Sequence, residues 1–162
     1  MFSEFLIRKV VNNIKSVNKS LFLFLFGFMM YITLEVLYRG YSFWLMGVCG
    51  GFTILILDQI NNRISWDFDL LLQGCIGSCI ITTFELIIGE LFLHGVLPVM
   101  WDYSNSFMNY KGIICLPFSL LWIGASILAI FCADAINYYV FNELPIPYYK
   151  IFGKTVLRFR GK

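Results

Sequence analysis

Four long apolar runs, separated by short polar segments, occupy most of the chain between residues 21 and 141. A helix needs about 20 residues to cross the hydrocarbon core of a bilayer. Backbone N–H and C=O groups in lipid must be hydrogen-bonded internally, so crossing segments of this length are helices. We therefore predict an all-α integral membrane protein, a four-helix bundle with spans at about residues 21–38, 42–60, 70–93 and 113–141.

The composition agrees with lipid as the main solvent of this protein. Of its 162 residues, 59% are hydrophobic and only 14% are charged, whereas a soluble domain has about 25% charged residues. The mean hydropathy of +0.77 points the same way. The length fits a single domain. All five cysteines lie in apolar runs, which favours buried small side chains over a disulfide framework or a metal site.

Residues 1–20 precede the first apolar run and have a different pattern. Apolar side chains recur there every three or four positions, at Phe2, Leu6, Val10, Ile14 and Val17. Four basic residues accompany them, so we predict an N-terminal amphipathic helix at an anionic membrane surface. A solvated lead-in to the first span is the alternative. Residues 142–162 are rich in Lys and Arg and are predicted to form a basic cytoplasmic tail.

The Lys and Arg residues are unevenly divided between the two sides that four spans would define. Ten of the 12 fall on the side that carries both termini and the loop between the second and third spans. Segments rich in Lys and Arg stay in the cytoplasm. We therefore expect a multi-pass protein of the plasma membrane with both termini in the cytoplasm.

Charged residues within or beside the apolar runs are the best candidates for a functional site. A carboxylate at the centre of a spanning helix costs about 2.5–3.5 kcal/mol on insertion scales, so it is rarely accidental. Glu35 and Arg39 are four residues apart at the outer end of the first span and share a helix face. Glu90 and His94 have the same spacing in the third span, and Glu85 lies more than a turn deeper.

We expect these five residues to form one polar cluster in the outer half of the bundle. Trp101, Asp102 and Tyr103 of the outer loop would lie within reach of it. Such a cluster could bind a cation, relay protons or bind a polar headgroup. The alternative is an ion-paired network that holds the first and third spans together. Asp134 lies about two turns from the inner end of the fourth span, where an anchor of the helix end is favoured over a ligand site.

Small residues predict close contacts between helices. The sequence Gly47-x-x-x-Gly51 in the second span is a GxxxG match. This motif lets two helix backbones approach closely. The sequence alone does not distinguish packing within the bundle from packing in a homodimer.

No arrangement of residues expected of an enzyme appears. The single histidine, His94, supports neither a His-based metal site nor a Ser–His pair. Gly153-Lys154-Thr155 resembles the end of a P-loop, but Tyr148 stands where the first glycine is needed. We predict a non-enzymatic protein without cofactor or metal. Its basic ends suit anionic lipid rather than nucleic acid, so the lipid bilayer is its expected partner.

Several short sequences together resemble a known family. Glu35-Val36-Leu37-Tyr38-Arg39-Gly40 closes the first span, and Ser42 and Trp44 open the second. Trp101-Asp102-Tyr103-Ser104 and the later run Ile114–Trp122 are the most specific parts. Over roughly residues 20–150 the chain resembles the small bacterial membrane proteins described as "putative ABC-transporter type IV".

This resemblance implies a bacterial plasma-membrane protein that acts as a permease-like transport subunit. It also implies a separate ATPase chain and a homo-oligomer, because the chain is short for half of a permease. The competing hypothesis is a structural or interaction membrane protein with no transport activity of its own. In that case the buried charges would only hold the helices together.

Overall fold

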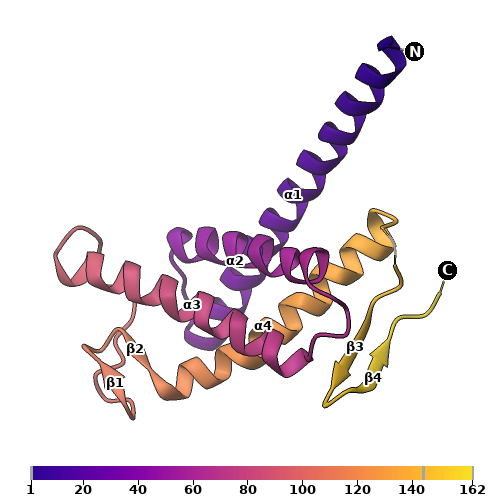
Figure 1. Ribbon diagram of the computed structural model, residues 1–162. Helices are drawn as coiled ribbons and strands as arrows, with labels where there is room; N and C mark the ends of the chain where they lie inside the picture. The colour runs from indigo at the N-terminus through magenta and orange to yellow at the C-terminus, as the bar shows by residue number, and fades with distance from the viewer. Residues whose placement is uncertain (1, 144, 162) are drawn as a thin grey trace.

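The computed structural model describes the backbone of residues 2–143 and 145–161, and the side chains of residues 14–60, 63–143 and 145–161. Helices dominate it, with two small hairpins at opposite ends of the helical body (Figure 1). The elements in chain order are α1 (Phe2–Arg39), α2 (Trp44–Arg63), α3 (Leu70–Leu93), β1 (Asn109–Tyr110), β2 (Ile114–Cys115), α4 (Leu116–Ala135), the π-helix η1 (Ile136–Val140), β3 (Tyr148–Ile151) and β4 (Lys154–Arg158).

Three helical segments of the described chain are long and apolar enough to cross a membrane. They are Ile14–Arg39, Leu70–Leu93 and Leu116–Val140. Trp44–Ile60 is a shorter apolar helix. The predicted all-α membrane fold is therefore confirmed. That the short second helix also crosses the bilayer stays a prediction.

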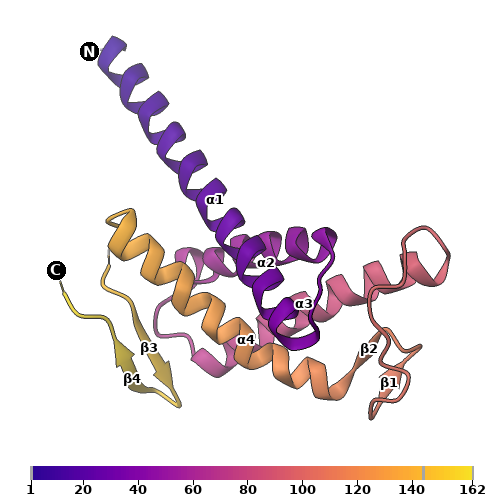
Figure 2. The same cartoon turned by 180° about the vertical axis from the view of Figure 1, so that it is seen from behind.

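The first helix, α1, runs without a break from Phe2 to Arg39. The sequence predicted an interfacial segment over residues 1–20 and then a span, and the structure joins the two in one helix. The reason is local, because no Pro or Gly interrupts the chain between residues 2 and 26. The helix ends at Gly40, whose φ of 83° allows the chain to turn back toward α2. Figure 2 shows the N-terminal part of α1 extending beyond the other helices.

Glycines allow α1 and α2 to pack closely. A Cβ atom at Gly50 would lie 2.6 Å from the Tyr31 Cβ and 2.8 Å from the Gly27 carbonyl oxygen. A Cβ atom at Gly51 would lie 2.6 Å from the ring of Phe24. The small-residue face of α2 is thus covered by α1 of the same chain. Of the two alternatives left by the sequence, the structure shows packing within the bundle.

The second pair of helices, α3 and α4, is equally close, and α2 contacts both of them. A Cβ atom at Gly77 would meet the side chain of Ser126 at 2.4 Å. Pro117 lies in the first turn of α4, where a missing N–H leaves no hydrogen bond unmade. At its other end α4 continues into η1.

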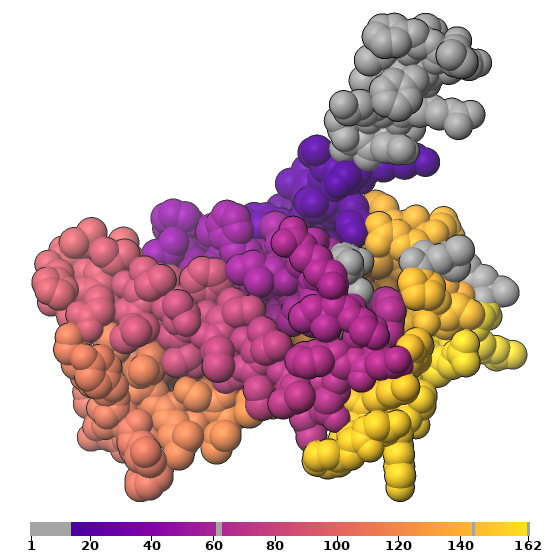
Figure 3. Space-filling view, in the orientation of Figure 1, coloured from indigo at the N-terminus to yellow at the C-terminus, as the bar shows by residue number. Residues whose placement is uncertain are grey.

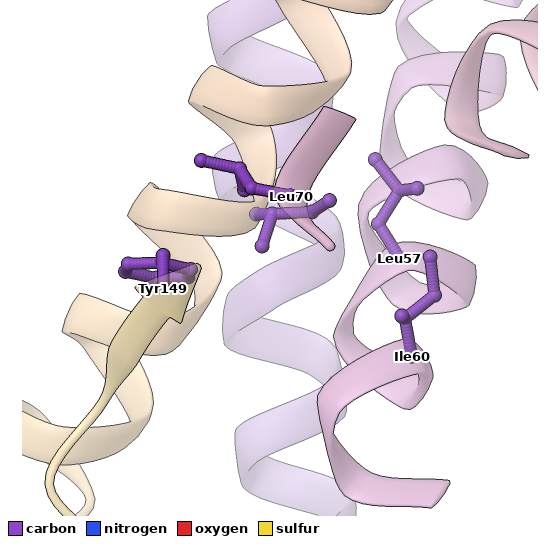
Figure 4. Close-up of a cluster of buried hydrophobic side chains, with 5 residues drawn as sticks. Leu57, Ile60, Leu70 and Tyr149 are labelled. Carbon is purple, nitrogen blue, oxygen red and sulfur yellow. The ribbon is translucent and has the colours of Figure 1, made fainter. Parts of the chain in front are cut away.

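The segment predicted as a basic tail folds into an antiparallel hairpin of β3 and β4. The side chain of Tyr149, in β3 of this hairpin, is fully buried and packs with Leu57, Ile60 and Leu70 (Figure 4). This hairpin lies at one end of the helical body, and β1 and β2 lie at the opposite end (Figure 3). We call these the hairpin end and the loop end.

Candidate intramembrane site

A cavity of about 90 Å³ lies between the four helices. Most of its wall is apolar, and every one of α1–α4 contributes to it. The polar and aromatic side chains that line it are Tyr31 from α1, Cys49 and Thr53 from α2, Phe84 and Glu85 from α3, and Trp122 and Ser126 from α4.

Glu85 is the only carboxylate among the residues that line this cavity, and it is 3% exposed. Its Oε1 atom accepts a hydrogen bond of 3.0 Å from the hydroxyl of Tyr103, a residue of the loop between α3 and β1. The Tyr103 ring stacks on Phe118 of α4, with ring centroids 4.6 Å apart. Burial and the neighbouring carboxylate raise the pKa of Tyr103, so the hydroxyl stays protonated and remains a donor.

Three buried polar atoms at this cavity lack a hydrogen-bond partner within the described part of the chain. They are Oε2 of Glu85, Nε1 of Trp122 and Oγ of Ser126. The Trp122 indole lies beside the Glu85 carboxylate and interacts with it, although the two atoms do not meet strict hydrogen-bond geometry. Buried polar groups are nearly always paired in folded proteins. The incomplete contact between Glu85 and Trp122, together with the unpaired hydroxyl of Ser126, therefore indicates a place where a solute or water completes their hydrogen bonds.

Glu35 and Arg39 form a separate ion-paired group at the loop end, in which Nε of Arg39 has no hydrogen-bond partner among the described residues. Arg39 Nη2 lies 2.6 Å from Glu35 Oε1, so the ion pair predicted from their spacing is present. Arg39 also donates to the carbonyl oxygen of Met100 at 2.5 Å, and the Ser42 hydroxyl donates to Glu35. These contacts join α1 to the start of α2 and to the loop between α3 and β1.

Glu90 belongs to a third, more exposed group. Lys111 Nζ lies 2.6 Å from Glu90 Oε1, and this hydrogen bond raises the pKa of Lys111. His94 Nδ1 is 3.8 Å from Glu90 Oε2 but only 2.8 Å from the Glu90 carbonyl oxygen. The expected single cluster is thus divided into three groups. The physical reason is that residues five apart, such as Glu85 and Glu90, point about 140° away from each other on a helix.

Trp101 and Asp102 shape the loop between α3 and β1 rather than line the cavity. Trp101 Nε1 donates to the carbonyl oxygen of Ile113 at 2.8 Å, and its ring packs on Phe92. Asp102 Oδ1 accepts from both the backbone N–H and the hydroxyl of Ser104, which lowers the pKa of Asp102. Together these contacts hold the segment that carries Tyr103 in place.

Asp134 lies far from these residues, at the hairpin end. Its Oδ2 atom accepts a 2.7 Å hydrogen bond from the Tyr149 hydroxyl, so it anchors the hairpin to α4. A second polar group lies at this end of the molecule. There Asp58 accepts from Asn137, and Lys19 Nζ lies 3.7 Å from Asp58 Oδ2. Neither group could be read from the sequence, because each joins segments far apart in the chain.

The cavity does not have the donors of a metal centre. Within the part of the chain that the structure describes, no group of three or more His, Cys, Asp or Glu side chains could hold a metal ion.

The fold and the cavity define the class as a helical membrane protein with a buried polar site among its helices. The family model described as "Putative ABC-transporter type IV" matches residues 16–159, and the chain belongs to that family. No curated protein and no solved structure matches it. The protein is therefore a membrane protein of a transporter-associated family.

Proposed function

We propose that the protein is a permease-like transport subunit and that the cavity beside Glu85 is its solute site. The observation that carries this proposal is the unpaired Oε2 of Glu85 at a cavity lined by all four helices. Ionisable groups inside membrane helices typically mark the path of an ion or a substrate. Sites for transported solutes are commonly buried among helices near the middle of the bilayer.

The two ends of the cavity are covered by different parts of the chain, which supports an occluded state. At the loop end, Tyr103 lies over Glu85 and is held by its stacking on Phe118. At the hairpin end, Leu57 lines the cavity and also packs in the cluster of Tyr149. Transport through this site requires one cover to open while the other stays closed.

A separate ATPase subunit is the energy source that we infer. Gly153, with a φ of 76°, lies in the turn between β3 and β4. A phosphate-binding loop instead lies between a strand and a helix, so this turn cannot bind nucleotide in that way. We infer that the ATPase contacts the hairpin end from the cytoplasm and that the chain works as a homo-oligomer in a bacterial plasma membrane.

A structural role without transport is the second candidate. It is favoured by the Glu35–Arg39 and Glu90–Lys111 pairs, in which each carboxylate has a basic partner within the chain. Such pairs fix the register of helices and loops. Glu85 separates the two candidates, because a purely structural carboxylate has no need of a cavity.

Flux through liposomes that contain the purified protein tests the proposal. Proton and monovalent-cation flux is measured for the wild type, for Glu85→Gln and for Glu90→Gln, with folding checked by thermal unfolding. We expect flux in the wild type and in Glu90→Gln, and its loss in folded Glu85→Gln. If none of the three gives flux, with or without the ATPase partner, and Glu85→Gln only lowers thermal stability, the structural role is correct.

A further inference from the structure

We propose that the cavity beside Glu85 binds a small alkylammonium ion, that is, a monovalent cation with an apolar body. This rests on the proposed function, because it names the substrate class of the same site. The features that carry it are the charge, the wall and the size of the cavity.

Glu85 is the acidic side chain that lines the cavity, and no protein cation pairs with it among the described side chains. Glu85 forms no ion pair there, since Arg39 is paired with Glu35 and Lys111 with Glu90. Tyr103 donates to one carboxylate oxygen, and the other lacks a hydrogen-bond partner. A buried carboxyl group loses its proton only where a positive charge compensates it, and otherwise it stays neutral. A positively charged solute in the cavity would provide that compensation.

The wall of the cavity disfavours hydrated inorganic ions. Mg²⁺ and Ca²⁺ take six or more oxygen ligands. Apart from the Glu85 carboxylate, the cavity offers only a few hydroxyl groups, among them those of Thr53 and Ser126. An alkylammonium ion needs no such shell, because its alkyl groups can contact apolar side chains directly.

Aromatic side chains strengthen the same preference. Tyr31, Phe84 and Trp122 line the cavity together with Glu85. Aromatic rings attract organic cations, most strongly when both are removed from water. One carboxylate and three aromatic side chains around an apolar space are the groups that ammonium recognition requires.

The volume limits the size of the solute. An apolar cavity of roughly 150 Å³ accommodates benzene, with its six carbon atoms. On that scale the present cavity of about 90 Å³ holds about three or four non-hydrogen atoms. Trimethylammonium, with one nitrogen and three carbons, is at the upper limit. Its neutral counterpart of similar shape is 2-propanol.

Equilibrium binding in lipid nanodiscs tests this assignment without any transport partner. Trimethylammonium chloride is titrated at neutral pH by calorimetry, beside sodium chloride and 2-propanol, into the wild type, Glu85→Gln and Glu90→Gln. We expect saturable binding of trimethylammonium alone, weakened at least about tenfold in Glu85→Gln, as follows from loss of a contact with a charged group. Glu90→Gln is the matched control on the same helix and should bind like the wild type.

A second variant covers the case in which Glu85→Gln does not fold. Phe84→Leu keeps an apolar side chain but removes one ring, so trimethylammonium should bind several-fold more weakly. Equal binding of 2-propanol, or no binding of trimethylammonium to folded wild type, would overturn the proposal. If binding fails while cation flux still depends on Glu85, the ligand class is wrong and the transport function stands. Binding without flux would leave the ligand class intact and refute the transport function.

Discussion

The hydroxyl of Tyr103 donates a 3.0 Å hydrogen bond to Oε1 of Glu85, and this contact connects the loop between α3 and β1 to the centre of the bundle. It also places the donor at the loop end of the cavity that Glu85 lines. Movement of this loop would therefore change the hydrogen bonding of the buried Glu85 carboxylate, because Tyr103 joins the two.

Tyr103→Phe tests that link. The ring and its stacking on Phe118 would remain, but Glu85 Oε1 would lose its donor. We expect thermal unfolding in detergent to show a loss of about 1–2 kcal/mol, in the range for a buried hydrogen bond to a charged group within a membrane protein. Tyr110→Phe, at an exposed tyrosine of β1, is the control and should have no effect. Equal stability of all three proteins would show that the hydrogen bond is not formed.

Close packing of α1 on α2 predicts opposite effects for two Gly→Ala variants. At Gly50 the new methyl group would lie within 2.8 Å of Tyr31 and of the Gly27 backbone, so we expect destabilisation by about 1–3 kcal/mol. At Gly124 no atom lies within 4 Å of the added methyl group. Alanine there should stabilise α4 by up to about 1 kcal/mol. Unfolding in the same detergent compares them, and a stabilising Gly50→Ala would refute the packing described.

The two carboxylate oxygens of Asp69 accept hydrogen bonds from two different elements, so substitutions at this residue can test both contacts. Oδ1 accepts from the Leu71 N–H and caps α3, while Oδ2 accepts from the Phe152 N–H in the hairpin. Asp69→Ala should lose both contacts, and the cap alone contributes about 1 kcal/mol. Asp69→Asn keeps one acceptor oxygen and should be intermediate. Thermal unfolding compares the stability of the wild type and the two variants. If Asp69→Asn is as unstable as Asp69→Ala, the capping role is contradicted.

The attachment of the hairpin should depend on pH through Asp67. Hydrogen bonds from Lys150 and Tyr148 lower the pKa of Asp67 below its usual value of 3.8. A carboxyl group with a lowered pKa contributes stability above its unfolded-state pKa and loses it as the pH falls through the folded-state value. We therefore expect the hairpin to loosen only below about pH 4. The effect should be small, because the Asp67 side chain is 60% exposed.

Fluorescence of Trp66, which packs on Tyr148 and Tyr149, reports that change. It is read in a protein whose other three tryptophans are replaced by phenylalanine. Asp67→Asn should remove the acid-dependent step in the signal. A step that persists unchanged in Asp67→Asn would assign the titration to another group.

The helical body could be predicted because each apolar run is long enough to specify a helix by itself. Glu85 could be singled out for the same reason, since a carboxylate inside such a run is costly wherever the run packs. The loop that carries Tyr103 could be placed near the predicted outer ends of the first and third spans, but its hydrogen bond to Glu85 could not be predicted. Trp122 follows Glu85 by 37 residues, and only the folded chain brings these side chains together.

The hairpin could not be predicted for a related reason. Its strands are four and five residues long, and most of their side chains are polar or exposed. What holds it is the burial of Tyr149 against α2, α3 and α4 and the hydrogen bond to Asp134. Those contacts depend on helix ends that lie far away in the chain.

Access of water to the cavity beside Glu85 can be measured directly with single cysteines. Native Cys49 lines that cavity, Cys115 is buried elsewhere, and Cys79 lies exposed on α3. Three proteins that each keep only one of these cysteines are treated in liposomes with a water-soluble, positively charged thiosulfonate. Because transport requires one cover of the cavity to open at a time, we expect slow modification of Cys49 while a cover is open, slower modification in Glu85→Gln, and an unreactive Cys115. A Cys49 as unreactive as Cys115 would contradict this, because neither cover would then open and the cavity would be a sealed part of the core.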